Sequence, residues 1–120
     1  MSADDTASDR GREDAEGPNT EPATYERVEI FDTTLRDGAQ QADLSYTVED
    51  RLRILHKLDQ VGFPYVEGGW PGANPTDSDF FAAAPILQNS TFTAFGMTKR
   101  NGRSAENDDV LSAVMNAGTP

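Results

Sequence analysis

The stretch that decides the fold is FDTTLRDGAQ, which occupies residues 31–40. It continues a short β-like segment that begins at Val28, and it sets Arg36 beside Asp37 just after the predicted strand ends. Folds of the α/β class carry their chemistry at the carboxyl ends of parallel strands. A cation next to a carboxylate at this position suggests a site that holds a metal ion and an oxyanion together.

Strand and helix patterns alternate from Tyr25 to the end of the chain. Strands are expected at residues 28–32, 65–69 and 91–96, and helices at residues 47–62, 77–84 and 104–118. Thr47 and Asp50 suit a capping box at the start of the first helix, and Gly62 suits its end. The short connections predict three βα units with parallel strands and right-handed crossovers. Such a sheet has two open edges and a small core, so we expect an amino-terminal piece of something larger.

Composition limits the possible functions. The chain has 120 residues and no cysteine, which excludes disulfides and thiolate metal sites. A formal charge of −11 argues against nucleic acid, whose phosphates would be repelled. No apolar stretch approaches the roughly 18 residues of a membrane span, and the polar start does not resemble a signal peptide. We therefore expect a cytoplasmic protein that binds neither nucleic acid nor membrane.

Residues 1–24 differ in composition from the rest of the chain. After Met1 they contain no aromatic or large aliphatic residue, and they carry seven acidic residues against Arg10 and Arg12. Such a segment buries too little apolar surface to offset its ordering entropy. The composition predicts a disordered acidic tail, with a partner-docking arm as the alternative.

Four residues carry the candidate chemistry. Asp37 is a hard oxygen ligand suited to a magnesium- or manganese-like cation. Arg36 offers a forked donor for a carboxylate or an enolate oxygen. Glu67 ends the second predicted strand, at the same edge of a parallel sheet, where it could orient a substrate or move a proton. Gln40 could donate a neutral hydrogen bond to a substrate carboxylate.

The alternative interpretation is purely structural. Arg-Asp-Gly tripeptides are common in turns, so Arg36 and Asp37 could form a surface pair in a turn capped by Asp32 or Thr33. On the residue pattern alone, the two interpretations stay open.

Three motifs carry a resemblance to a known family. Residues 32–40 resemble the first-strand signature of the DRE-TIM metallolyases, which include the 2-isopropylmalate, homocitrate and citramalate synthases. Residues 65–75 and 94–100 look like the citramalate synthase branch. The resemblance runs from about Val28 to Pro120. It implies an α/β fold comprising the first three βα units of a TIM (β/α)8 barrel, with residues 25–120 as a truncated pyruvate carboxyltransferase-like domain.

The resemblance also implies a reaction and roles for the four residues. The family joins acetyl-CoA to a 2-oxo acid, here pyruvate, as in isoleucine biosynthesis; 2-isopropylmalate synthase of leucine biosynthesis is the alternative. By this resemblance Asp37 ligates a divalent cation, magnesium or manganese ahead of zinc. Arg36 steadies the keto oxygen and the enolate charge, Gln40 contacts the 2-oxo acid, and Glu67 matches the catalytic glutamate. The full-length parent is expected to be a homodimer.

One departure from the family pattern matters. The family completes its metal site with a His-x-His pair on a late strand, whereas the one histidine here is His56. We expect His56 to be an ordinary residue of an outer helix, and the 120-residue chain to be inactive alone. The third strand is followed by Lys99, Arg100 and Arg103. These basic residues either form a solvated loop or face the substrate and attract the phosphates of CoA or a carboxylate.

A different class of function is kept as an alternative. The chain could be a non-catalytic binding module that pairs its open sheet edge with a partner barrel. The intact set of Arg36, Asp37 and Glu67 argues against it, because a scaffold would not need them.

Overall fold

The structure is a computed structural model, and it describes residues 24–120. The prediction of a disordered acidic tail at residues 1–24 lies outside the described residues, apart from Thr24. The elements follow one another as β1 (Phe31–Asp32), η1 (Gly38–Gln40), α1 (Val48–Val61), β2 (Tyr65–Glu67), α2 (Pro75–Ala83), β3 (Thr91–Thr93), η2 (Ala105–Asn107) and α3 (Asp109–Met115).

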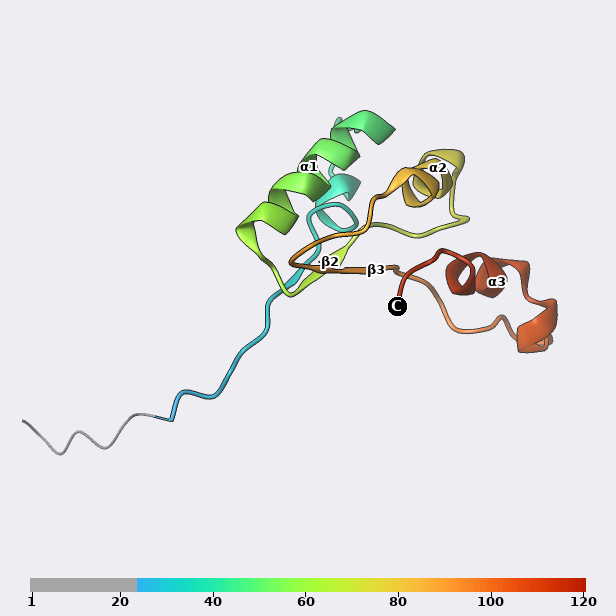
Figure 1. Cartoon of the computed structure of the whole chain (residues 1–120). Helices are drawn as coiled ribbons and strands as arrows, with labels where there is room; N and C mark the ends of the chain where they lie inside the picture. Colours follow the sequence, from blue (N-terminus) through green and yellow to red (C-terminus); the bar gives the residue numbers. More distant parts are fainter. Residues whose placement is uncertain (1–23) are drawn as a thin grey trace, which may run out of the picture.

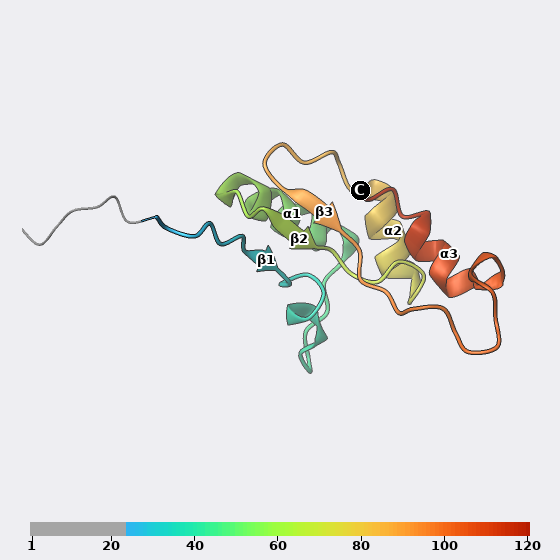
Figure 2. The ribbon, with the colours of Figure 1, turned by 90° about the horizontal axis from the view of Figure 1, so that it is seen from below.

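The three strands form one parallel sheet in the order β1-β2-β3. Phe31 pairs with Tyr65, and Tyr65 pairs with Thr91, so the strands run in register. Helices α1 and α2 cover one face of this sheet, and α3 lies beside α2 beyond β3 (Figure 1, Figure 2). The predicted α/β class with three βα units is confirmed, and the sheet is open rather than closed into a barrel.

Helix α1 begins and ends as its sequence predicts. The Thr47 hydroxyl accepts from the backbone N–H of Asp50 at 3.1 Å, and the Asp50 carboxylate accepts from the Thr47 N–H at 3.1 Å. Gly62 ends the helix at φ +87°, in the left-handed region that favours glycine. Leu55 is fully buried on the face that packs on the sheet.

The core lies between the sheet and the helices. Its buried apolar residues come from the loop after β1, from β2 and from two helices: Leu35, Leu55, Val66, Phe80 and Phe81. Phe92 of β3 completes the cluster, since its ring stacks on Phe81 at 4.8 Å between centroids and meets Phe80 edge-on at 5.7 Å. Aromatic pairs therefore join β3 to α2.

The sequence placed two helix starts incorrectly. Helix α2 begins at Pro75, because the Asn74 side chain caps it by accepting from the Asp77 N–H at 2.8 Å. Helix α3 begins at Asp109, because Asp108 accepts from the N–H groups of Val110 and Leu111. Ser104 precedes only a 3-10 turn and makes no side-chain capping bond.

Asp108 should make stability depend on acidic pH. Its carboxylate is 1% exposed and accepts from the Arg100 backbone N–H at 2.6 Å, which is the main cause that lowers its pKa from 3.8 to about 2. A carboxyl group whose pKa is lower in the folded than in the unfolded chain stabilises the fold at pH values above its unfolded-state pKa. That contribution disappears as the pH falls toward 2. We expect Asp108→Asn to lower the urea midpoint at pH 7 and to match the unmodified chain near pH 2. A midpoint difference that persists unchanged near pH 2 would contradict this role.

None of the helices in residues 24–120 is both long enough and apolar enough to span a membrane.

Candidate active site

The chain turns tightly after β1. The Thr33 carbonyl accepts from the backbone N–H groups of residues 36–38, at 2.9 to 3.2 Å. Asp32 accepts from the backbone N–H of Thr34 at 3.1 Å and from its hydroxyl at 2.9 Å. The turn that the structural alternative predicted is therefore present, and Asp32 caps it by binding Thr34. It fixes the backbone from which Arg36 projects.

The guanidinium of Arg36 is held by three groups. Its Nε donates to the carboxylate of Glu67, and its Cζ lies 4.4 Å from the centroid of the Phe95 ring. Its Nη1 is 3.5 Å from Asp37. The pKa of Arg36 is raised, chiefly by the hydrogen bond to Glu67. Among the described residues Nη2 has no hydrogen-bond partner, so one end of the fork is free to receive a ligand.

Glu67 lies where the parallel sheet was expected to place it. It ends β2, is 7% exposed, and meets Arg36 at the carboxyl edge of the strands. The parallel pairing of β1 and β2 thus brings together Arg36 and Glu67, which are 31 positions apart in the sequence. Because the Arg36 guanidinium covers the Glu67 carboxylate, the direct partner of this carboxylate is Arg36, which it holds in place.

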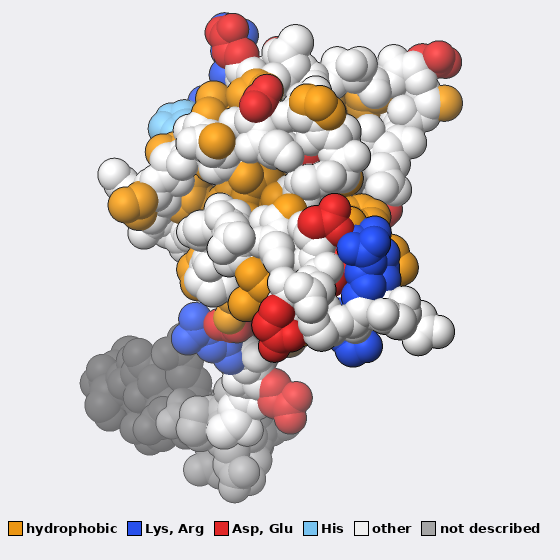
Figure 3. All heavy atoms as spheres, turned by 90° about the vertical axis from the view of Figure 1, so that its right-hand side faces the viewer, with side chains coloured by type: hydrophobic (Ala, Val, Ile, Leu, Met, Phe, Trp, Pro, Cys, Tyr) orange, Lys and Arg blue, Asp and Glu red, His pale blue; other side chains and the backbone are white. Residues whose placement is uncertain are grey.

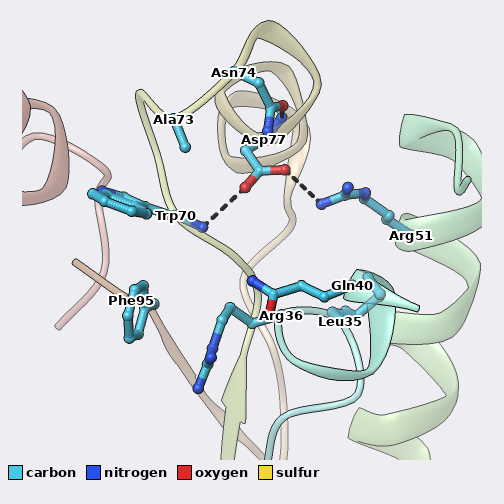
Figure 4. A pocket seen from close by; sticks show the side chains of 10 residues that line it. Leu35, Arg36, Gln40, Arg51, Trp70, Ala73, Asn74, Asp77 and Phe95 are labelled. Atoms are coloured by element: carbon cyan, nitrogen blue, oxygen red, sulfur yellow. Dashed lines mark hydrogen bonds and ion pairs between the residues drawn. The ribbon is translucent and has the colours of Figure 1, made fainter. Parts of the chain in front are cut away.

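A pocket of about 200 Å³ opens beside Arg36 (Figure 4). We call it the Arg36 pocket, and its lining comprises Leu35, Arg36, Ala39, Gln40, Arg51, Trp70, Ala73, Asn74, Asp77 and Phe95. Gln40 therefore forms part of the pocket wall. Glu67 lies behind Arg36, and Asp37 lies outside the lining with its side chain 67% exposed.

The residues for a metal ion are incomplete. Within residues 24–120 no three His, Cys, Asp or Glu side chains gather into a cluster that could hold one. His56 is exposed on α1, as predicted for an ordinary helix residue. Asp37 offers one exposed carboxylate, so the residues described do not by themselves form a metal site.

Sequence reasoning missed four polar or aromatic members of the pocket, which are Arg51, Asn74, Asp77 and Phe95. Phe95 supports Arg36, and Arg51 pairs with Asp77 beneath the Asn74 cap. The order Asn74-Pro75-Thr76-Asp77 was a usable signal, because it is typical of a capped helix start. Nothing in the local pattern indicated that Asp77 would reach Arg51.

The two glycines after β2, Gly68 and Gly69, allow close packing within the chain. Cβ atoms at Gly68 and Gly69 would meet Phe92 and Asp77, so glycine at these positions lets the chain pack closely on itself. Trp70 both packs on Phe95, edge-on at 5.5 Å, and lines the pocket.

The basic loop after β3 is largely neutralised. Arg100 pairs with Asp108 and Asp109, and Arg103 lies 3.7 Å from Asp109. Basic and acidic side chains accordingly adjoin on this face of the molecule (Figure 3). Lys99 forms no ion pair within the described part of the chain.

Three parallel βα units with a charged pocket at the carboxyl ends of the strands have the arrangement in which α/β proteins place their functional sites. Residues 27–108 match the model of one such family, described as HMGL-like. The chain belongs to the HMGL-like family. No solved structure matches it.

The chain is also similar to individual proteins that are named synthases. The chain is 45% identical over 97 residues to an (R)-citramalate synthase of Aquifex aeolicus, covering 79% of this chain and 18% of that protein. It is 46% identical over 92 residues to an (R)-citramalate synthase of Streptomyces coelicolor, covering 74% and 17%. A 2-isopropylmalate synthase of Thermosynechococcus vestitus is 46% identical over 93 residues, covering 78% and 17%. The chain thus spans less than a fifth of the length of these relatives.

Proposed function

We propose that the chain supplies the 2-oxo acid site of a citramalate synthase. In this reaction the methyl carbon of acetyl-CoA loses a proton and forms a bond to the keto carbon of pyruvate, whose oxygen takes up a proton. Water then cleaves the thioester, which gives citramalate and free CoA. The observation that carries the proposal is the Arg36 guanidinium, held by Glu67 and Phe95 at the edge of a small pocket. Relatives named (R)-citramalate synthase support the choice of reaction.

The size and donors of the Arg36 pocket suit a small anion. A volume of about 200 Å³ is below the range of drug-sized sites and accommodates a ligand of a few heavy atoms. Arg36 supplies the free end of its fork, and Gln40 supplies a neutral donor. Fixed donors of this kind stabilise oxygen charge as it develops during carbon–carbon bond formation. In this proposal Glu67 holds Arg36 in place, and it can orient the substrate or move a proton.

A divalent metal is part of the proposal through Asp37. When bound, such a cation would polarise the keto oxygen of the substrate, and magnesium or manganese suits a carboxylate ligand better than zinc. The remaining ligands would come from residues other than those described. We therefore propose that the 120 residues alone do not turn over acetyl-CoA.

The substrate decides between the two synthases. In the whole gene product that contains this chain, we expect thioester consumption to be at least about tenfold faster with pyruvate than with 2-oxoisovalerate, since an extra branch must fit beside Trp70 and Phe95. Release of free CoA thiol measures both rates under the same metal concentration. A preference for the branched acid would replace this proposal with 2-isopropylmalate synthase, the name that three of the similar proteins carry.

A further inference from the structure

We infer that Asp77 is a positioning residue, which fixes Trp70 and, through it, the aromatic support of Arg36. This inference rests on the proposed function only in naming the pocket as a substrate site. The contacts that carry it are all within the described residues. Figure 4 shows the bonds of Asp77 to Trp70 and Arg51, with the side chains of Phe95 and Arg36 nearby.

Both carboxylate oxygens of Asp77 are occupied. Oδ1 accepts from Arg51 Nη1 of α1 at 2.8 Å, and Oδ2 accepts from the backbone N–H of Trp70 at 3.0 Å. The side chains of Asp77 and Arg51 are 11% and 12% exposed, so the pair is shielded from solvent. Removing either oxygen would leave a buried donor without its partner. Asp77 therefore joins α1, the start of α2 and the loop after β2 at one point.

The backbone before Trp70 is shaped for this contact. Gly69 has φ +151°, and a Cβ added there would lie 3.1 Å from Asp77 Oδ2. The Gly69 carbonyl in turn accepts from the Phe95 N–H at 2.8 Å. The peptide group that joins Gly69 to Trp70 is thus held at its N–H by α2 and at its carbonyl by the chain after β3.

A short series of contacts connects this peptide to the chemistry. The Trp70 ring packs edge-on against Phe95 at 5.5 Å, and the Phe95 ring lies under the Arg36 guanidinium at 4.4 Å. If Asp77 no longer holds Trp70, Phe95 loses one side of its packing. The direction in which Arg36 presents its free donor then changes, although Asp77 itself touches neither Arg36 nor Glu67.

The test uses Trp70, the one tryptophan in the sequence, as an optical reporter. In the 120-residue chain, we expect Asp77→Asn to raise acrylamide quenching of Trp70 fluorescence about twofold or more, because an amide turns one acceptor into a donor facing a donor. The far-UV circular dichroism should stay unchanged. Unchanged quenching in a folded Asp77→Asn chain would overturn the inference.

The matched control is Asp59→Asn. Asp59 is also a buried carboxylate, 8% exposed, and it accepts from the backbone N–H groups of residues 88–90 instead of Trp70. A general loss of stability would affect both variants, whereas we expect quenching at Trp70 to rise only in Asp77→Asn. Equal rises in the two variants would reduce Asp77 to a structural residue.

A second measurement covers the case in which Asp77→Asn does not fold. In the unmodified chain, the Trp70 backbone amide should exchange with deuterium as slowly as the Phe95 amide, which donates to the Gly69 carbonyl. Exchange as fast as that of an exposed loop amide would contradict the inference. Neither readout uses acetyl-CoA or pyruvate, so an absence of synthase activity would count against the proposed function and leave Asp77 untouched.

Discussion

Replacement of Arg36 by methionine in the whole gene product is expected to lower the rate of citramalate formation about 100- to 1000-fold, the usual cost of removing a fixed donor from a developing oxyanion. Methionine fills similar volume but loses the hydrogen bond to Glu67, the charge over the Phe95 ring and the guanidinium donor that the proposal gives to the substrate. It also leaves the Glu67 carboxylate buried without its cation. The release of CoA thiol from acetyl-CoA in the presence of pyruvate measures the rate.

Arg53→Met is the matched control for this change. Arg53 pairs with Glu49 on α1 at 2.6 Å, but both side chains are almost three-quarters exposed, and exposed pairs contribute little. We expect this variant to keep its activity within about twofold. Similar activity in Arg36→Met and Arg53→Met would show that the Arg36 pocket is not where the reaction occurs.

Gly68→Ala is expected to produce the largest loss of stability. A Cβ at this position would overlap the Phe92 ring and lie 3.1 Å from Phe81 Cζ. Phe92 cannot move aside, because Phe81 stacks on one side of it and Phe80 meets it edge-on. Overpacking of this kind costs about 1–3 kcal/mol, which is large for a core of this size. The urea midpoint, followed by far-UV circular dichroism, measures the loss.

The control for this variant is Gly38→Ala, where the nearest atom to an added Cβ is 3.8 Å away, an ordinary contact distance. We expect its urea midpoint to stay close to that of the unmodified chain. If Gly68→Ala and Gly38→Ala unfold at the same urea concentration, the packing of Phe92 against the glycine does not limit stability.

The parts of the fold that were predictable depend on local pattern. The capping box of Thr47 and Asp50 and the end at Gly62 are set by neighbouring residues, so α1 was placed within a residue. Parallel strands bring their carboxyl ends to one edge of the sheet, and for that reason the sequence predicts that Arg36 and Glu67 lie at the same edge, where the structure pairs them. Helix α3 was less predictable, because both Ser104 and Asp108 can cap a helix. Asp108 is the cap in the structure, where its carboxylate also accepts from the distant Arg100 N–H.

The parts of the site that were missed depend on distant contacts. Asp77 was recognised only as a residue of a helix start, yet it binds Arg51 from another helix, 26 positions away. Phe95 was predicted to lie in a strand. It follows the end of β3 at Thr93, and the path of the chain there places its ring under Arg36. Side chains that join three elements cannot be identified from spacing, since spacing describes one element at a time.

The most direct test of the central claim is the identity of the product. The whole gene product, supplied with acetyl-CoA, carbon-13-labelled pyruvate and a divalent metal, is expected to form labelled citramalate together with an equal amount of free CoA. The Arg36→Met variant, prepared in parallel, should form about a hundredth of that amount or less. The claim would be contradicted if the unmodified protein formed no citramalate, or if the variant formed as much as the unmodified protein.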